Sequence, residues 1–404
     1  MNKVAKWISI TFIALVALAA IGWSSIGSDW QALLSDPPQD TNLLFWSQSQ
    51  RDVGFKMMDK LPLLVKSSSI KPSANPRILP DGEKLEFNVD MDAFFAKQSL
   101  SGAIILHKGN VRYERYAIGH SPEKRWTSFS VAKSLTSSLV GIALQEGHIN
   151  SLNDNVSDYI DGLKGSAYDN VTIVQLLTMT SGVQWNEDYT DPQSDVAKFN
   201  NHVANDGLPT IVSYMRNLPR AYPAGEQWQY STGETNLIGI LVGEATGQTV
   251  AQYLTEKIWQ PFGMENRASW LLGSDSSEIS GCCIQASLRD FARYGLFVLE
   301  DGKIDGTTIL PEGWFEMATR KQADISKPGE GYGYQWWTFD DGSFTARGIF
   351  GQTIFIDPRR QLVVAFNGNW KNATNGELNR QRFEFIDTVR ATVDQEGYNI
   401  ATLP

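Results

Sequence analysis

The chain has 404 residues, enough for one large catalytic domain of two lobes or for two domains. Its formal net charge of −10 and pI near 5.0 argue against a nucleic-acid-binding protein. The four histidines have no ligand spacing, so no metal site is predicted. Cys282 and Cys283 are adjacent and would close a strained ring poorly, so we interpret them as small buried residues and not as a disulfide.

The N-terminal segment differs in kind from the rest of the chain. Lys3 and Lys6 precede an apolar run from Trp7 to Trp23, about seventeen residues, the short end of what spans a bilayer. The basic flank would stay cytoplasmic and the remainder would be exported. A signal peptide cleaved after Ala17-Leu18-Ala19 has the same pattern. Because aromatic residues bracket the run, we favour an uncleaved anchor.

The segment after the anchor carries few signs of regular structure. Residues 29–98 mix prolines with short apolar pieces, which is typical of a tether followed by an irregular covering segment. Residues 102–107 and 111–116, joined by Lys108-Gly109-Asn110, then predict a β-hairpin.

Residues 127–144 predict a helix that is buried along one side. Its apolar residues recur at the helical period: Val131, Leu135, Leu139, Ile142 and Ala143. Ser130 stands at the start of this helix, and Lys133 lies one turn later on the same face, within reach of it. Two other Ser-x-x-Lys quartets, at 68–71 and 121–124, do not open an apolar helix.

A serine at a helix N-terminus can serve two chemical purposes. The backbone N–H of Ser130 would be unpaired, with the positive end of the helix dipole behind it. Ser130 can therefore be a nucleophile and part of an oxyanion hole, with Lys133 as its base. In the alternative interpretation, Ser130 only caps the helix and Lys133 is a solvated residue.

Residues 151–280 are mostly helical and loop in pattern, and they predict a largely α lobe. Thr172 is expected to cap a short helix, and residues 234–243 predict another helix. Tyr230 precedes that second helix, where its hydroxyl can lie in a cleft and ionise more easily beside a lysine; a buried aromatic is the alternative. The polar aromatic loop 185–192 either lines a pocket or is ordinary surface.

The C-terminal part returns to strands. The expected elements are a helix at 287–296, a strand at 332–337, a meander of strands at 344–348, 353–357 and 362–367, and a closing helix from 377 to about 392. Strands at both ends of the chain predict one antiparallel sheet, an α+β arrangement. Gly348 weakens its strand unless something approaches the backbone, which would let the Ile349 N–H act as an oxyanion donor; a β-bulge is the alternative.

Three pieces in this order resemble the motifs of the serine β-lactamase and penicillin-binding-protein superfamily: Ser130-Val131-Ala132-Lys133, Tyr230-Ser231-Thr232 and the strand at Arg347-Gly348. Within it, the chain is most similar to the class C β-lactamase-related group, in its 6-aminohexanoate-dimer hydrolase branch. The likeness covers about Ser101 to Asn369. It implies a β-lactamase-like fold over 99–400, with a sheet lobe at about 99–150 and 281–400 and the α lobe inserted at about 151–280.

The resemblance also implies roles for single residues. Ser130 would be the acyl-accepting nucleophile, Lys133 its base and Tyr230 the proton relay to the leaving group. The backbone N–H groups of Ser130 and Ile349 would form the oxyanion hole. The implied substrate pocket contains Tyr189, Asp191, Thr232, Gly348 and Phe350. Neither a metal nor a cofactor is implied.

Two positions depart from the pattern of the superfamily. Thr232 stands where asparagine is common, and Ala346 stands where a lysine often begins the third motif. Arg347 should point to the opposite face of its strand. We therefore predict an exported serine hydrolase that cleaves small esters or amides through an acyl-serine. The alternatives are β-lactamase or D,D-peptidase activity, or a catalytically silent protein that binds peptidoglycan fragments.

The expected location is the bacterial inner membrane, with residues 1–28 as a single anchor and the catalytic domain in the periplasm. A soluble periplasmic protein with a cleaved signal is the alternative. The expected partners are a small-molecule substrate and the membrane, not nucleic acid, and the sequence does not indicate an oligomeric state.

Overall fold

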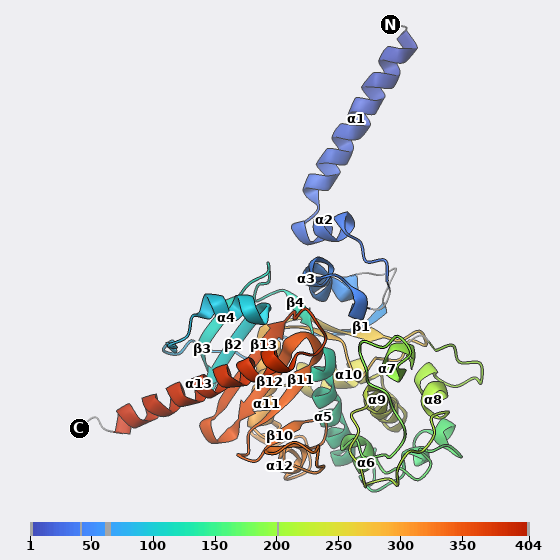
Figure 1. The fold of residues 1–404 in the computed structure, drawn as a ribbon, viewed down its shortest axis with the longest axis vertical. Coiled ribbons are helices and arrows are strands. Elements are labelled where there is room, and N and C mark those ends of the chain that lie inside the picture. The colour runs from blue at the N-terminus through green and yellow to red at the C-terminus, as the bar shows by residue number, and fades with distance from the viewer. Residues whose placement is uncertain (1–2, 41–42, 61–65, 200–201, 402–404) are drawn as a thin grey trace. The chain divides into compact units, whose positions relative to one another are not determined.

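The computed structural model describes residues 3–40, 43–60, 66–199 and 202–401 (Figure 1). The chain forms two compact units, residues 1–55 and residues 56–404. The first contains α1 (Lys3–Ser25), α2 (Ser28–Ser35) and most of α3 (Gln48–Met57). Residues 5–25 of α1 are long and apolar enough to cross a membrane. An N-terminal signal sequence has the same properties, so anchor and cleaved signal both stay predictions.

A seven-stranded antiparallel sheet dominates the second unit, in the order β3-β2-β13-β12-β11-β10-β9. Its strands are β2 (Leu100–His107), β3 (Asn110–Tyr116), β9 (Glu330–Tyr332), β10 (Trp337–Phe339), β11 (Phe344–Gly348), β12 (Gln352–Asp357) and β13 (Leu362–Gly368). The hairpin of β2 and β3 joins the C-terminal strands because β2 pairs with β13, with Ile104 opposite Ala365. The prediction of one sheet built from both ends of the chain is confirmed.

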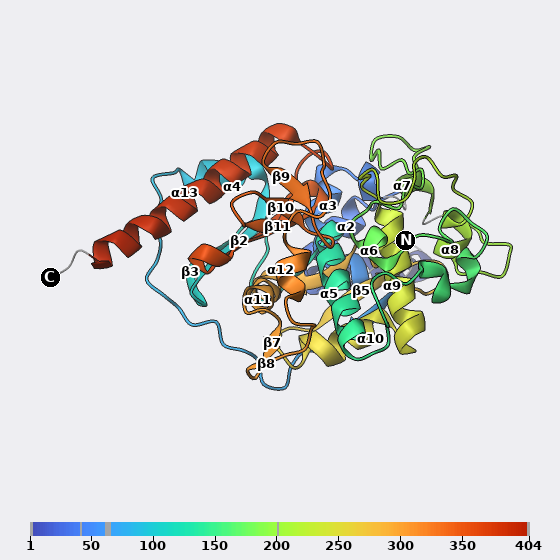
Figure 2. The same ribbon diagram turned by 90° about the horizontal axis from the view of Figure 1, so that it is seen from below.

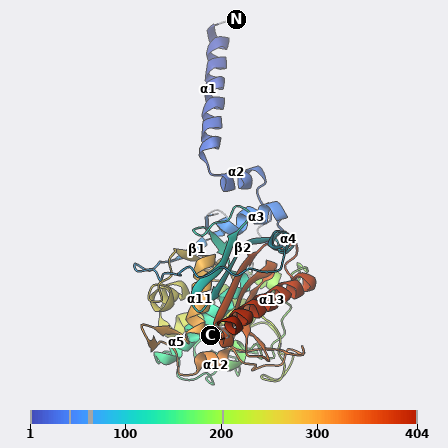
Figure 3. The same cartoon turned by 90° about the vertical axis from the view of Figure 1, so that its left-hand side faces the viewer.

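Helices cover both faces of this sheet (Figures 1 and 3). Because side chains alternate along a strand, Ile104 and Ile105 enter different cores. Ile104 packs in the core that includes α11 (Leu288–Leu299). Ile105 packs in the core of α4 (Met91–Gln98) and α13 (Gly376–Ala401), which extends further than the predicted closing helix.

A second sheet of four strands was not predicted. It has the order β1-β5-β6-β4 and consists of β1 (Lys66–Ile70), β5 (Ala268–Leu272), β6 (Ile284–Ser287) and β4 (Arg125–Thr127). These strands are short, and β1 reads Lys-Ser-Ser-Ser-Ile, without apolar alternation. Pairing with β5 therefore determines the strand conformation of β1.

The prediction of one strand over residues 332–337 is wrong. β9 ends at Tyr332 and β10 begins at Trp337, so the residues between them form a turn. A Cβ at Gly333 would lie 2.0 Å from the carbonyl oxygen of Ala318, and Gln335 has a φ of 64°. The side chain of Gln335 donates to the carbonyl of Leu177 at 2.9 Å. These tertiary contacts outweigh the strand propensity of the aromatic residues.

In sequence, the α lobe lies between the N-terminal and the C-terminal strands of the seven-stranded sheet (Figure 2). The remaining helices are α5 (Ala132–Gln145), α6 (Ile173–Leu177), α7 (Asp195–Lys198), α8 (Thr210–Met215), α9 (Thr232–Thr246), α10 (Val250–Leu254) and α12 (Trp314–Ala318), and a small hairpin joins β7 (Lys303–Ile304) to β8 (Thr307–Thr308). Thr172 caps α6 as predicted, since its Oγ1 accepts from the Gln175 N–H. Ser231 caps α9 in the same way.

Glu234, in the first turn of α9, makes stability depend on pH. Its side chain is 2% exposed, and burial raises the pKa of the carboxyl from 4.5 to about 8. Because the pKa is higher in the folded protein than in the unfolded chain, the protonated Glu234 carboxyl contributes fully to the free energy of unfolding below pH 4.5. Above that pH the contribution falls by about 1.4 kcal/mol per pH unit, and it is lost as pH rises through 8.

We expect Glu234→Gln to remove most of this decline, because a neutral amide of the same shape has no proton to lose. Thermal unfolding at pH 6 and pH 9, followed by circular dichroism, measures the change in Tm for each protein. Equal falls in Tm for the variant and the unaltered chain would contradict the prediction.

Candidate active site

Ser130 lies in the 3-10 turn Phe129–Val131, which leads directly into α5. Phe129 has a φ of 43°, a left-handed conformation that costs a non-glycine residue about 1–3 kcal/mol. Gly348 of β11 approaches this turn so closely that a Cβ there would lie 2.7 Å from the carbonyl oxygen of Ser128. Gly348 therefore lets β11 pass close beside the turn that carries Ser130, which is the close approach expected of a glycine in this strand.

Lys133 is buried beneath Ser130 in the first turn of α5. Its side chain is 1% exposed, and Nζ donates to Thr232 Oγ1 at 3.0 Å and to the carbonyl oxygen of Gly281 at 2.6 Å. Burial lowers the pKa of the ammonium from 10.5 to about 8, against the attraction of the Glu187 carboxylate. A lysine with this pKa can act as a proton acceptor near neutral pH.

Tyr230 lines the same cavity as Ser130, and the centre of its ring lies 5.3 Å from Lys133 Nζ. We expected the neighbouring lysine to make this phenol easier to ionise. The structure shows the opposite, because burial and the Glu187 carboxylate raise the pKa of Tyr230 above its usual value. The resting hydroxyl is therefore protonated and able to donate.

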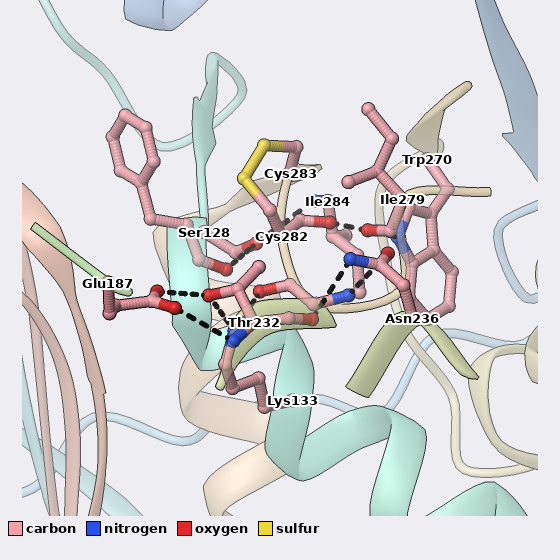
Figure 4. The surroundings of a disulfide bond; sticks show 12 residues. Ser128, Lys133, Glu187, Thr232, Asn236, Trp270, Ile279, Cys282, Cys283 and Ile284 are labelled. Carbon is pink, nitrogen blue, oxygen red and sulfur yellow. Dashed lines mark hydrogen bonds between the residues drawn. A yellow bond between two sulfur atoms is a disulfide. The ribbon is translucent and has the colours of Figure 1, made fainter. Parts of the chain in front are cut away.

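Glu187 belongs to this site, although the sequence analysis did not select it. Its carboxylate accepts from the Thr232 N–H at 2.9 Å, the Tyr189 hydroxyl at 2.6 Å, the Thr232 hydroxyl and the indole N–H of Trp185. Thr232 accepts from Lys133 and donates to Glu187, so it connects the lysine to the carboxylate (Figure 4). The one signal for Glu187 was its place in the polar aromatic loop 185–192.

Cys282 and Cys283 form a disulfide, which corrects our interpretation of them as separate buried residues (Figure 4). The backbone turns at Cys283, where φ is 76°, and a backbone turn of this kind is not visible in the spacing of the cysteines. The disulfide directly follows Gly281, whose carbonyl accepts from Lys133. The N–H of the next residue, Ile284, donates to the Ser128 hydroxyl oxygen at 2.9 Å, so the segment is held on both sides of the bridge.

A cavity of about 370 Å³ lies over these groups. Its lining includes five residues that the sequence predicted for the site: Ser130, Tyr189, Tyr230, Gly348 and Ile349. Lys133 and Thr232 are buried, hydrogen-bonded to each other, and are not part of this lining.

Besides Thr232, two other predicted pocket residues, Asp191 and Phe350, do not line the cavity. Asp191 accepts from the Gln193 N–H at 2.8 Å inside its own turn. Phe350 is buried with its ring centre 5.3 Å from that of Phe129, where it supports the turn that carries the serine. Both were chosen for their place in a motif, which does not determine the direction of a side chain.

Arg347 lies on the face of β11 opposite Ala346, as predicted. Ala346 packs in the core of α11, whereas the Arg347 guanidinium lies 5.0 Å from the centre of the Trp337 ring. The cavity nevertheless extends to Arg347, and it also reaches Arg382 on α13. The motif pattern pointed to a cation only at position 346, and nothing in it indicated Arg382. Among the described residues, no group of three histidine, cysteine or acidic side chains is placed to hold a metal ion.

A serine, a buried lysine and a tyrosine around one cavity, in this fold, define a serine hydrolase. The family model described as Beta-lactamase matches residues 90–385, and the chain belongs to this family. It is 27% identical over 307 residues to the 6-aminohexanoate-dimer hydrolase of Paenarthrobacter ureafaciens, with 72% of this chain and 76% of the relative covered. The sequence resemblance is thereby confirmed.

Solved structures show the same fold. A Bacillus anthracis protein assigned provisionally to the 6-aminohexanoate-dimer hydrolases superposes with a TM-score of 0.74 at 22% identity, over 92% of this chain and 97% of the other. A penicillin-binding protein from Bacillus halodurans superposes with a TM-score of 0.58 at 16% identity, over 74% and 99%. The prediction of a β-lactamase-like α+β fold is therefore confirmed.

Proposed function

We propose that this hydrolase cleaves small amides or esters through an acyl-enzyme on the Ser130 hydroxyl oxygen. The observation that carries the proposal is one cavity lined by Ser130 and a protonated Tyr230, with Ser130 one helical turn from a lysine whose pKa is about 8. The likeness to a hydrolase of 6-aminohexanoate dimer supports a small substrate. The cavity of about 370 Å³ is of the size that small ligands occupy.

The proposed reaction has two steps. Lys133, as a free amine, takes the proton of Ser130 while the serine oxygen attacks the substrate carbonyl, and the backbone N–H groups of Ser130 and Ile349 stabilise the oxyanion. Tyr230 gives its proton to the leaving amine or alcohol and regains one from the Lys133 ammonium. Water then attacks the acyl-serine while Lys133 takes one of its protons, and the Lys133 ammonium returns this proton through Tyr230 to the Ser130 oxygen, which releases the acid and restores Ser130.

Labelling with a fluorophosphonate tests the nucleophile. Intact-mass spectrometry followed by peptide mapping is expected to find one adduct, on Ser130. The adduct should be absent in Ser130→Ala and present in Ser128→Ala, whose hydroxyl is engaged by backbone groups of Phe129 and Ile284. A folded protein that takes no label, or takes it on another residue, would overturn the proposal.

The pH dependence of kcat/KM tests the base. Because Lys133 must be neutral to accept a proton, kcat/KM for a small ester should rise with pH and level off, with an apparent pKa near 8. Glu187 raises the pKa of Lys133, so Glu187→Gln should shift the rise to lower pH. Asp191→Asn, in the same loop but outside the cavity, serves as the control. A profile that Glu187→Gln moves to higher pH would contradict this role.

We also propose that residues 1–28 form an inner-membrane anchor, 29–98 a tether and covering segment, and 99–400 the exported catalytic domain. The apolar α1 supports the first part. Membrane fractionation and N-terminal mass analysis test it, and a mature N-terminus at Ala20 would contradict the anchor.

A further inference from the structure

The disulfide between Cys282 and Cys283 does not belong to the lining of the Ser130 cavity, and the proposed reaction gives it no task. Cys282 is partly exposed, whereas Cys283 is buried, with 4% of its surface exposed. The chain contains only these two cysteines. A dithiol in solution can therefore reach the bridge at Cys282, and no third cysteine of the chain competes for either sulfur.

The residue before the bridge is in direct contact with the proposed base (Figure 4). The carbonyl oxygen of Gly281 accepts from Lys133 Nζ at 2.6 Å, which is shorter than the 3.0 Å bond from Nζ to Thr232. A Cβ at Gly281 would lie 3.1 Å from Nζ and 2.9 Å from Thr232 Cγ2, so the fit is tight. Because Lys133 is 1% exposed, bulk water does not replace this acceptor. A shift of the Gly281 backbone therefore moves the lysine or breaks its hydrogen bond.

The residue after the bridge is held to the turn that carries the nucleophile. The N–H of Ile284 donates to the Ser128 hydroxyl oxygen at 2.9 Å, and its carbonyl accepts from the Ser128 N–H at 2.8 Å. Ser128 directly precedes the 3-10 turn Phe129–Val131, which contains Ser130. The bridge thus lies between one residue that holds the base and another that holds the turn of the nucleophile.

The backbone at the bridge has a conformation that a reduced cysteine does not favour. Cys283 has a φ of 76°, in the left-handed region that non-glycine residues rarely adopt. A bond between the side chains of two consecutive residues restricts the backbone between them, and reduction removes this restriction. A rotation about φ of Cys283 moves the residues before it relative to those after it. Since Ile284 is held on Ser128, the movement displaces Gly281.

We propose that the Cys282–Cys283 disulfide is a redox-sensitive site that holds Lys133 in place, and that its reduction by a small dithiol slows the hydrolase. The inference rests on the proposed function, because the bridge acts through the base. A thiolate of the dithiol attacks the Cys282 sulfur, the S–S bond breaks and Cys283 leaves as a thiolate. The second thiol of the reductant then displaces Cys282 from the mixed disulfide. The reductant becomes a disulfide, and its two protons end on the two cysteines.

Reduction of the full-length chain in detergent with dithiothreitol tests the site. Intact-mass spectrometry after iodoacetamide should find two added groups in the reduced chain and none in the unreduced chain. After removal of the reductant, kcat/KM for a small ester at pH 9 should be about ten-fold lower, as for the loss of a hydrogen bond to a charged group. It should recover when oxidised glutathione closes the bridge. Hydrogen–deuterium exchange over residues 279–284 should become faster on reduction.

Two double variants separate the backbone conformation from the chemistry of the thiols. Cys282→Ser with Cys283→Ser forms no bridge, so it should have the low kcat/KM of the reduced enzyme and no response to dithiothreitol. Cys282→Ser with Cys283→Gly also lacks the bridge, but glycine adopts a φ near 76° without a steric penalty. The glycine variant should therefore be roughly three-fold more active than the double serine variant, or better.

Iodoacetamide labelling of the unreduced chain would mean that no bridge forms, and it would overturn the proposal. An unchanged kcat/KM in a chain with two alkylatable cysteines would do the same, as would a double serine variant as active as the oxidised enzyme. If the oxidised enzyme turns over no ester, the proposed reaction fails. Faster exchange over residues 279–284 on reduction would then still support the bridge as the group that holds this segment.

Discussion

Ser130→Ala is expected to lower kcat for a small activated ester by roughly 10⁶-fold, the loss seen when the nucleophile of a serine hydrolase is removed. The side chains of Lys133 and Tyr230 would remain in place, but no atom could form the acyl intermediate. The burst of p-nitrophenol that precedes steady turnover, measured by stopped flow, should vanish with it. The variant should stay folded, since Ser130 contributes only a small side chain at the cavity wall.

Ser121→Ala is the matched control, because Ser121 begins another Ser-x-x-Lys quartet but lies in a turn outside the cavity. It should keep both the burst and the steady rate. Ser130→Ala that retains a burst of normal amplitude would contradict the assignment of the nucleophile. Such a result would direct the search to another hydroxyl of the site.

Lys133→Met is expected to lower kcat/KM by about 10⁴-fold, the upper range for loss of a general base. Methionine fills a similar volume in the buried site but accepts no proton. The residual rate should lose the rise with pH near 8 that the lysine confers. Steady-state kinetics from pH 5 to pH 10 measure both effects, and Tm shows whether the unpaired Gly281 carbonyl and Thr232 hydroxyl destabilise the variant.

Lys133→Arg separates proton transfer from charge. Arginine keeps the positive charge but cannot become neutral in this pH range, so it should be nearly as inactive as methionine. If Lys133→Arg restored most of the rate, the lysine would act by its charge alone. The proposed role as base would then be wrong.

Local patterns predicted much of the fold. The helical period of residues 131–143 placed Ser130 and Lys133 on one face, because that geometry depends only on residues three and four apart. The three C-terminal strands and the cap at Thr172 followed from alternation and capping in the same way. The turn at 333–336 was missed because Gln335 bonds to α6, far away in sequence.

The sequence by itself determined which side chains can carry the chemistry and which short segments become helices and strands, since both depend on residue type and nearby spacing. Only the tertiary structure decided that Glu187 stands behind Thr232, that Arg382 reaches the Ser130 cavity and that β1 pairs with β5. These contacts join segments far apart in the chain. No local pattern predicts them, because each depends on how whole elements pack against one another.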